Sequence, residues 1–259
     1  MVVGIDKFKE FFKGYEGSYI VIGGTACDII TENAGFEPRA TDDIDIVLIV
    51  EGLTPEFIKR FWEFVQTGQY NTRQKAPEHR NNYRFCEPQM AGFPKQIELF
   101  GKASEAIDLF PDAHLTPIPV EEGLSNLSAI LLDGDYYQYV LEHSTIVDDV
   151  HLANIESIIC LKAYAYLDNL RRKTEGQDVK TRDIVKHKND IFRMAFQLPV
   201  GVVYELPEAV KATMQEFVTT IKTDLPNAAI LEDKGYGKQD MKSVFDKIVS
   251  AFNLTVPNP

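Results

Sequence analysis

The chain has 259 residues and a formal net charge of -12, with 27 Lys and Arg against 39 Asp and Glu. Its 44% hydrophobic and 25% charged residues are typical of an ordinary globular protein and exclude disordered, collagen-like and coiled-coil classes. Because an acidic protein repels the phosphate backbone of nucleic acids, extended nucleic-acid binding is excluded too, and only a local basic patch could make such a contact.

The cysteines and the apolar runs bear on where the protein works. Cys27, Cys86 and Cys160 are far apart and show no paired ligand spacing, which favours reduced thiols over a disulfide framework or a zinc site. No apolar run approaches the roughly 20 residues that a membrane span needs. We therefore expect a soluble, cytoplasmic protein with no membrane partner.

The amino half alternates helical and extended patterns. Apolar positions at helical spacing predict a short helix over residues 5–13, and a β-branched run predicts a strand over 19–22 that ends at Gly23-Gly24. Thr25 is the expected N-cap of the next helix, which ends at Gly35. A strand over 41–50, a helix over 55–64 and strands over 83–86 and 96–100 follow. Asp133-Gly134 predicts a hairpin between strands over 129–132 and 135–141.

The carboxyl half has mostly helical patterns. Helices are predicted over 155–170, 183–197, 207–222 and 240–252, and the polar stretch 171–182 is predicted to be an exposed loop. The fold class is therefore α+β, with a small mixed β-sheet flanked by helices over residues 1–150 and a mostly helical domain over 151–259. No Gly/Ser-rich linker marks the boundary near residue 150.

Two aspartates stand out in the strand over 41–50. Asp43 and Asp45 are two residues apart, so their carboxylates project from the same face of the strand. Two like charges this close favour a compensating cation, and Mg²⁺ takes one or two carboxylates together with waters and substrate phosphates. The alternative is an acidic strand entrance without a ligand.

A glycine turn and a third acid strengthen the interpretation of this pair. Gly23 and Gly24 let backbone approach a ligand, and the amides at the helix start together with the Thr25 hydroxyl can hold phosphate oxygens. Glu98 lies on a later strand, with its side chain on the opposite face from that of Ile97. It would complete a site for two metal ions. The alternative for the two glycines is a plain turn, and the alternative for Glu98 is an exposed glutamate beside Lys95.

These motifs resemble a known superfamily. Gly23-Gly24-Thr25 followed by Thr41-Asp42-Asp43-Ile44-Asp45-Ile46 is similar to the signature of polymerase-beta-type nucleotidyltransferases. Lys162 on a helix, followed by the segment 186–193, resembles the AbiEii-like group, which includes toxins of bacterial toxin–antitoxin pairs. The resemblance implies a nucleotidyltransferase fold whose helical domain closes the nucleotide cleft.

The resemblance also implies roles for individual residues. Asp43, Asp45 and Glu98 would be the catalytic acids and the ligands of two Mg²⁺ ions. Nucleotide binding would fall to the glycine turn, the helix lysine and a later aspartate: Gly23, Gly24, Thr25, Lys162 and Asp190. In this chain the third acid is Glu where the family pattern has Asp.

The helical pattern supports Lys162 independently of the resemblance. Lys162 falls within the apolar stripe that contains Ile155, Ile159 and Tyr166, so its amine must reach solvent or meet an anion. That anion is either a triphosphate oxygen or a carboxylate, with Asp190 and Glu98 as the candidates for a structural ion pair.

The sequence therefore predicts a metal-dependent nucleotidyltransferase that moves a nucleoside monophosphate from an NTP to an acceptor hydroxyl. The acceptor could be RNA, such as a tRNA end, a protein or a small molecule, and a toxin-like role would imply an antitoxin partner. Two alternatives stay open: an adenylyltransferase that modifies an antibiotic, and a module that binds a nucleotide or a partner without catalysis.

Overall fold

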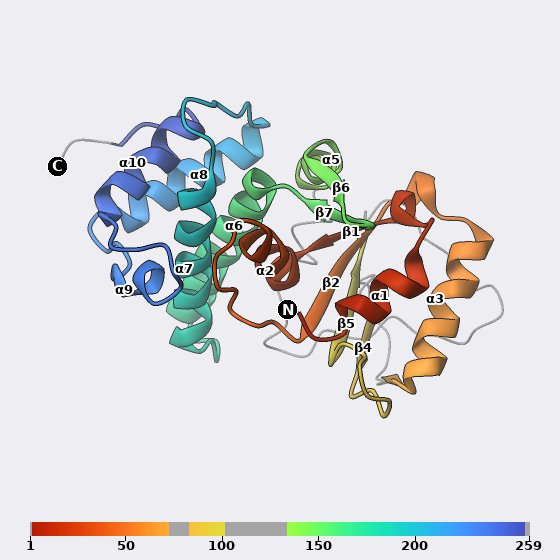
Figure 1. Ribbon diagram of the computed structural model, residues 1–259. Helices are drawn as coiled ribbons and strands as arrows, with labels where there is room; N and C mark the ends of the chain where they lie inside the picture. Colours follow the sequence, from red (N-terminus) through yellow and green to blue (C-terminus); the bar gives the residue numbers. More distant parts are fainter. Residues whose placement is uncertain (1, 73–82, 102–133, 257–259) are drawn as a thin grey trace. The chain divides into compact units, whose positions relative to one another are not determined.

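The computed structural model describes residues 2–72, 83–101 and 134–256, and they form two compact units. The first unit consists of residues 1–29 and 39–153, and the second of residues 30–38 and 154–259. The fold is α+β, with a mixed sheet in the first unit and helices in the second (Figure 1). The second unit thus takes in residues 30–38, a segment far from the predicted boundary near residue 150.

The described strands form one sheet of seven, in the order β3-β4-β5-β2-β1-β7-β6. At its centre β2 (Asp43–Leu48) is antiparallel to β1 (Tyr19–Ile22) and parallel to β5 (Gln96–Phe100). The outer strands are β3 (Asn71–Thr72), β4 (Tyr83–Cys86), β6 (Ser144–Val147) and β7 (Val150–Ala153). The predictions at 19–22, 83–86 and 96–100 match these bounds, and the strand predicted at 41–50 is shorter at both ends.

An aromatic core covers one face of this sheet. Helices α1 (Ile5–Phe12) and α3 (Pro55–Gly68) lie side by side in Figure 1. From these helices, Phe8 contacts Tyr19 of β1 with ring centroids 5.1 Å apart, and Phe61 contacts Phe85 of β4 at 5.3 Å. Burying each such ring stabilises the fold by about 1.5–3 kcal/mol, so this face of the sheet is committed to the core.

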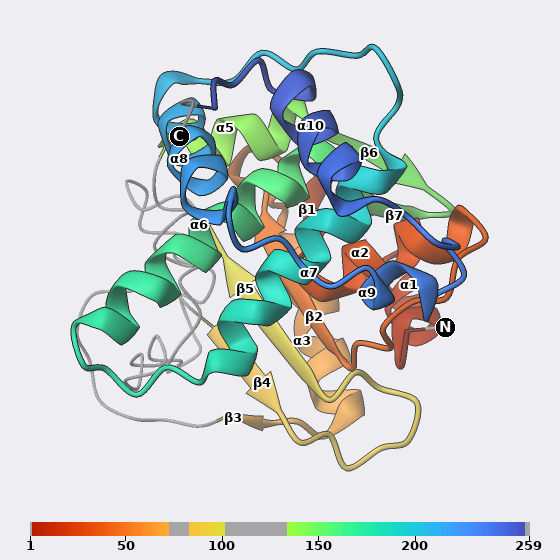
Figure 2. The same cartoon turned by 90° about the vertical axis from the view of Figure 1, so that its left-hand side faces the viewer.

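The second unit is built around two helices, α6 (Ile155–Thr174) and α7 (Thr181–Gln197), which lie side by side in Figure 2. Helix α8 (Glu208–Ile221) packs on α6, and α10 (Met241–Ala251) packs on α7. Segment 30–38 joins this unit through Phe36, whose ring stacks on Tyr236 with centroids 4.0 Å apart. The last turn of helix α2 (Gly23–Asn33), which begins in the first unit, therefore belongs to the second.

The predicted hairpin at Asp133-Gly134 is wrong. Residues 134–142 form helix α5 (Gly134–Glu142), and the first predicted strand lies outside the described residues. The segment that follows Gly134 contains three buried tyrosines, and one of them, Tyr137, donates its hydroxyl to the Leu48 carbonyl at 3.2 Å. Tertiary packing thus decided between helix and strand where local propensity favoured the strand.

The polar stretch 171–182 is only partly a loop. Helix α6 continues to Thr174 and α7 begins at Thr181, so the charged residues occupy the ends of two helices. Arg171, Arg172 and Lys173 lie in the last turn of α6, where cations interact favourably with the helix dipole.

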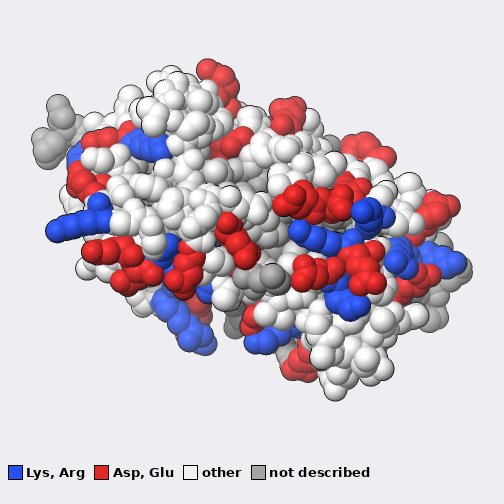
Figure 3. All heavy atoms as spheres, viewed as in Figure 1, with Lys and Arg blue, Asp and Glu red and all other residues white. Residues whose placement is uncertain are grey.

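Basic and acidic side chains also interleave over the face shown in Figure 3. Among the described helices, none combines the length and apolar character that a membrane crossing requires.

Candidate functional site

The three predicted acids lie on one face of the sheet. In the strand register Asp45 is paired with Glu98 of β5 on one side and with Ile22 of β1 on the other. Directly paired residues share a face, so Asp43, Asp45 and Glu98 all lie on the face opposite the aromatic core. Asp43 and Asp45 are partly exposed, whereas Ile44 and Ile46 between and beyond them are buried. The prediction that the two aspartates share a face is confirmed.

The backbone of Gly23 lies against the carboxylate of Asp45. Its φ is +68°, a left-handed conformation that L side chains rarely adopt. A Cβ at this position would overlap Oδ2 of Asp45 and lie 2.9 Å from its Cγ. The close approach predicted for the glycine is therefore made to a carboxylate of the chain itself, and the lack of a side chain at Gly23 lets Asp45 lie beside the start of α2.

Thr25 links the helix to the acidic strand. The helix begins at Gly23, so the prediction that Thr25 is its N-cap is wrong. The Thr25 side chain is fully buried, and its hydroxyl donates a hydrogen bond to the backbone carbonyl of Asp43. This bond and the fit of Gly23 against Asp45 fix the start of α2 to both ends of the Asp-Ile-Asp segment.

Glu98 is a buried carboxylate that forms an ion pair with Arg84. Only 7% of its surface is exposed; Arg84, its cross-strand neighbour on β4, pairs with Oε1. The side-chain amide of Gln96 donates to the same oxygen at 2.9 Å. Glu98 thus lies where the sequence predicts, yet it is not the exposed edge residue beside Lys95 that was the alternative. The Lys95 amine instead pairs with Asp42.

The donor set fits a magnesium ion that keeps most of its waters. Across the described residues, no group of three His, Cys, Asp or Glu side chains lies close enough to enclose a metal. Asp43 and Asp45 offer two partly exposed carboxylates on one face, and Mg²⁺ commonly takes one or two carboxylates from the protein. The carboxylate of Glu98, the third predicted ligand, is paired with Arg84 through Oε1.

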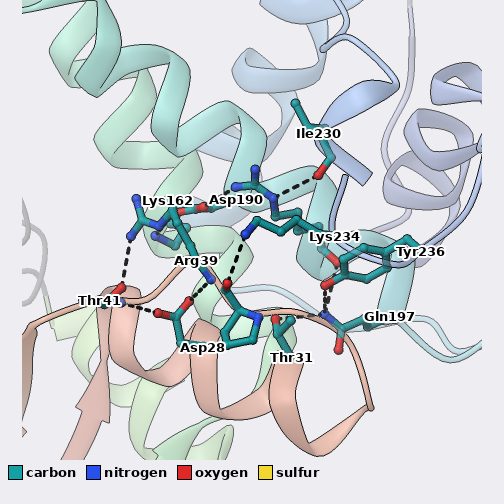
Figure 4. A network of polar contacts seen from close by, with 12 residues as sticks. Asp28, Thr31, Arg39, Thr41, Lys162, Asp190, Gln197, Ile230, Lys234 and Tyr236 are labelled. Carbon is teal, nitrogen blue, oxygen red and sulfur yellow. Dashed lines mark hydrogen bonds and ion pairs between the residues drawn. The ribbon is translucent and has the colours of Figure 1, made fainter. Parts of the chain in front are cut away.

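A clamp that the sequence analysis missed precedes the acidic strand. Asp28, on α2, is 3% exposed, and its two carboxylate oxygens accept hydrogen bonds from the backbone amides of Arg39 at 3.1 Å and Thr41 at 2.6 Å (Figure 4). The guanidinium of Arg39 in turn donates to the Thr41 hydroxyl at 3.3 Å. The signal in the sequence was an aspartate within a helix that is otherwise apolar at its start.

Lys162 and Asp190 form a buried ion pair with each other in the second unit. The amine of Lys162 lies 2.8 Å from Oδ2 of Asp190, and both side chains are at least nine-tenths buried. Arg193 contacts the other carboxylate oxygen at 3.1 Å and donates to the Ile230 carbonyl (Figure 4). The structure thus shows Lys162 in a structural ion pair with Asp190, one of the two carboxylates considered as its partner.

The predicted residues therefore fall into two groups. Six lie together in the first unit, namely Gly23, Gly24, Thr25, Asp43, Asp45 and Glu98. Lys162 and Asp190 are together in the second unit. A nucleotide role for these two residues stays a prediction.

Neither a protein-family model nor a curated protein matches the chain. Among solved structures, it is similar to the crystal structure of an antigenic nucleotidyltransferase-like protein from Paracoccidioides brasiliensis, with 15% sequence identity and a TM-score of 0.45. The likeness covers 89% of this chain and 94% of that one. Because identity and TM-score are both low, we base the functional proposal on the chain's own residues.

Proposed function

We propose that the protein is a metal-dependent nucleotidyltransferase, which transfers a nucleoside monophosphate from an NTP to an acceptor hydroxyl and releases pyrophosphate. The observation that carries this proposal is the fit of Gly23 against Asp45. A glycine with left-handed backbone at the start of a helix leaves room for the partly exposed carboxylate of Asp45, which lies on the same strand face as Asp43 and Glu98.

The arrangement combines groups that phosphoryl chemistry needs. The first turn of α2 presents backbone amides at the positive end of the helix dipole, which favours phosphate oxygens. The carboxylates of Asp43 and Asp45 would hold Mg²⁺, which when bound neutralises charge on the phosphates and activates the attacking oxygen. Glu98 would be the third acid and would accept the proton of the acceptor hydroxyl once Arg84 releases it.

Residues of the second unit add to the proposal. Lys162 and Asp190 would contact the nucleotide, with the amine exchanging a carboxylate oxygen for a phosphate oxygen. The finer assignments, an AbiEii-like toxin role with an antitoxin partner and a tRNA end or small molecule as acceptor, are part of the same proposal and rest on the sequence motifs.

The test is magnesium-dependent transfer from each of the four labelled NTPs, with cell extract, purified RNA and small-molecule hydroxyl acceptors. We expect label transfer by the wild-type protein and its loss in the double variant Asp43→Asn with Asp45→Asn. Full activity of that variant would contradict the proposed mechanism.

Asp42→Asn is the matched control. It removes one carboxylate of the same Asp-Asp-Ile-Asp segment, but this carboxylate pairs with the exposed Lys95. Transfer should therefore persist in the control while it disappears in the double variant. If both lose activity equally, the loss reflects the net charge or the folding of the segment and not a metal-binding pair.

One observation favours a second candidate, a module that binds a nucleotide without turning it over. Glu98 and Asp190 are each already neutralised by a cation of the chain, Arg84 and Lys162 respectively. Calorimetry with Mg²⁺ and NTP distinguishes the candidates, because tight binding with no transfer to any acceptor supports the module.

A further inference from the structure

We infer that Arg39 is a phosphate-binding residue of the proposed nucleotide site and that Asp28 is the residue that positions it. This inference rests on the proposed function and extends it, because Arg39 is absent from the residues that the motifs indicate. It also supplies a cation within the same unit as the acids and the glycine turn.

The Arg39 guanidinium lies beside Gly24. A Cβ added at Gly24 would lie 3.0 Å from Nη2 of Arg39 and 2.8 Å from the Thr41 hydroxyl. Gly24 has no left-handed backbone, so this glycine is explained by the side chains that lie against it. The Arg39 guanidinium therefore lies next to the first turn of α2, where the amides would meet phosphate oxygens.

The backbone of Arg39 is held in place by Asp28. Residues 39–41 follow the second unit's segment 30–38 and lead straight into β2. Asp28 accepts hydrogen bonds from the backbone amides of Arg39 and Thr41, so one buried carboxylate holds both ends of the three-residue segment 39–41. Between them Ala40 has φ +65°, a conformation costly for a non-glycine residue, which the clamp stabilises.

The Arg39 side chain has the chemistry to bind phosphate oxygens. Arg39 is partly exposed, and its planar guanidinium matches phosphate oxygens with two parallel N–H donors. On a chain of net charge -12, a cation of the protein beside the glycine turn would add to the charge that Mg²⁺ supplies when bound, and so favour an incoming triphosphate. The hydrogen bond from the guanidinium to the Thr41 hydroxyl, together with the held backbone of residues 39–41, reduces the conformational freedom that Arg39 would lose on binding an anion.

The test measures the affinity for each of the four NTPs with Mg²⁺ by calorimetry, using the full chain. Arg39→Gln should weaken binding by about tenfold or more, the usual consequence of losing a charge-assisted hydrogen bond. Lys59→Gln is the matched control, because it removes one positive charge from an exposed position on α3 of the same unit. Its affinity should stay at the wild-type value.

The role of Asp28 requires a readout that a purely structural residue would not move. If Asp28 acts through Arg39, Asp28→Asn weakens NTP binding in the wild-type background but adds nothing in the Arg39→Gln background. Thermal unfolding of each variant shows separately how much stability the clamp contributes. Should Asp28→Asn fail to fold, Asp28→Glu takes its place in the same double-mutant comparison, and Arg39→Gln still tests phosphate binding because the Arg39 side chain is partly exposed.

The outcomes separate the inference from the proposed function. If the wild-type protein binds NTP and Arg39→Gln binds it equally well, the inference is wrong and the proposed function stands. If the effects of Asp28→Asn and Arg39→Gln multiply fully, the positioning role is wrong. Absence of any wild-type binding to the four NTPs overturns both.

Discussion

Replacing Gly23 by alanine tests whether the start of α2 is built around Asp45. The substitution adds a single methyl group, but it meets two separate obstacles. The backbone has φ +68°, and the new Cβ would overlap Oδ2 of Asp45. The Asp45 carboxylate is therefore expected to move away from the helix in the variant.

The magnitude follows from two contributions. A non-glycine residue in left-handed backbone costs about 1–2 kcal/mol, and overpacking against a neighbour adds typically 1–3 kcal/mol. We therefore expect Gly23→Ala to lower the free energy of unfolding by roughly 2–5 kcal/mol in total. Gly14→Ala separates the contributions, because Gly14 has φ +86° and no atom within 4 Å of its ideal Cβ. The control should lose only the backbone contribution, about 1–2 kcal/mol.

Urea unfolding measures both variants, and magnesium–NTP calorimetry measures what happens to the acids. We expect Gly23→Ala to be the less stable of the two and to lose most of its NTP affinity, while Gly14→Ala binds normally. If the two variants have the same stability, Asp45 does not lie against Gly23, and the observation that carries the proposed function fails.

Two further predictions concern the second unit. Asp190→Asn should destabilise the protein by about 3–5 kcal/mol, because buried Lys162 and its neighbour Arg193 both pair with the Asp190 carboxylate. Lys162→Met should cost less, because Arg193 still neutralises Asp190. Urea unfolding that gave the reverse order of stabilities would contradict this prediction. Burial raises the pKa of the Cys160 thiol, so it keeps its proton when folded, and the free energy of unfolding should fall as pH rises above the ordinary thiol pKa of about 8.5. A Cys160→Ala variant should show a shallower fall between pH 8.5 and about 10, where tyrosines begin to ionise, and an equal slope in both proteins would refute the assignment.

Local patterns predicted the elements around the acids because those elements have strong and distinct periodicities. The β-branched run at Tyr19–Ile22 and the alternation from Asp43 to Ile46 leave little choice but strands. The same alternation placed Asp43 and Asp45 on one face. Four helices of the carboxyl half followed equally directly from their apolar spacing.

What the sequence could not supply depends on contacts between distant residues. Whether Glu98 is available to a metal depends on Arg84, which is brought opposite it only by the pairing of β4 with β5. Whether Lys162 meets phosphate or carboxylate depends on Asp190, 28 residues later. Residues 30–38 likewise belong to the second unit through contacts such as the stacking of Phe36 on Tyr236, which no local sequence pattern predicts.

The two motifs that indicated a nucleotide site turn out to be one physical unit. Gly23 accommodates the Asp45 carboxylate, and the Thr25 hydroxyl holds the Asp43 carbonyl. Asp28, one helical turn further along α2, holds the backbone of residues 39–41, which precede β2. Two of these contacts tie the start of the helix to the strand, and the third holds the segment that precedes the strand, so a side chain added at Gly23 would displace the Asp45 carboxylate. Mg²⁺ commonly takes one or two carboxylates from a protein, and this junction offers two partly exposed ones on one strand face, which is why the proposal places the metal here.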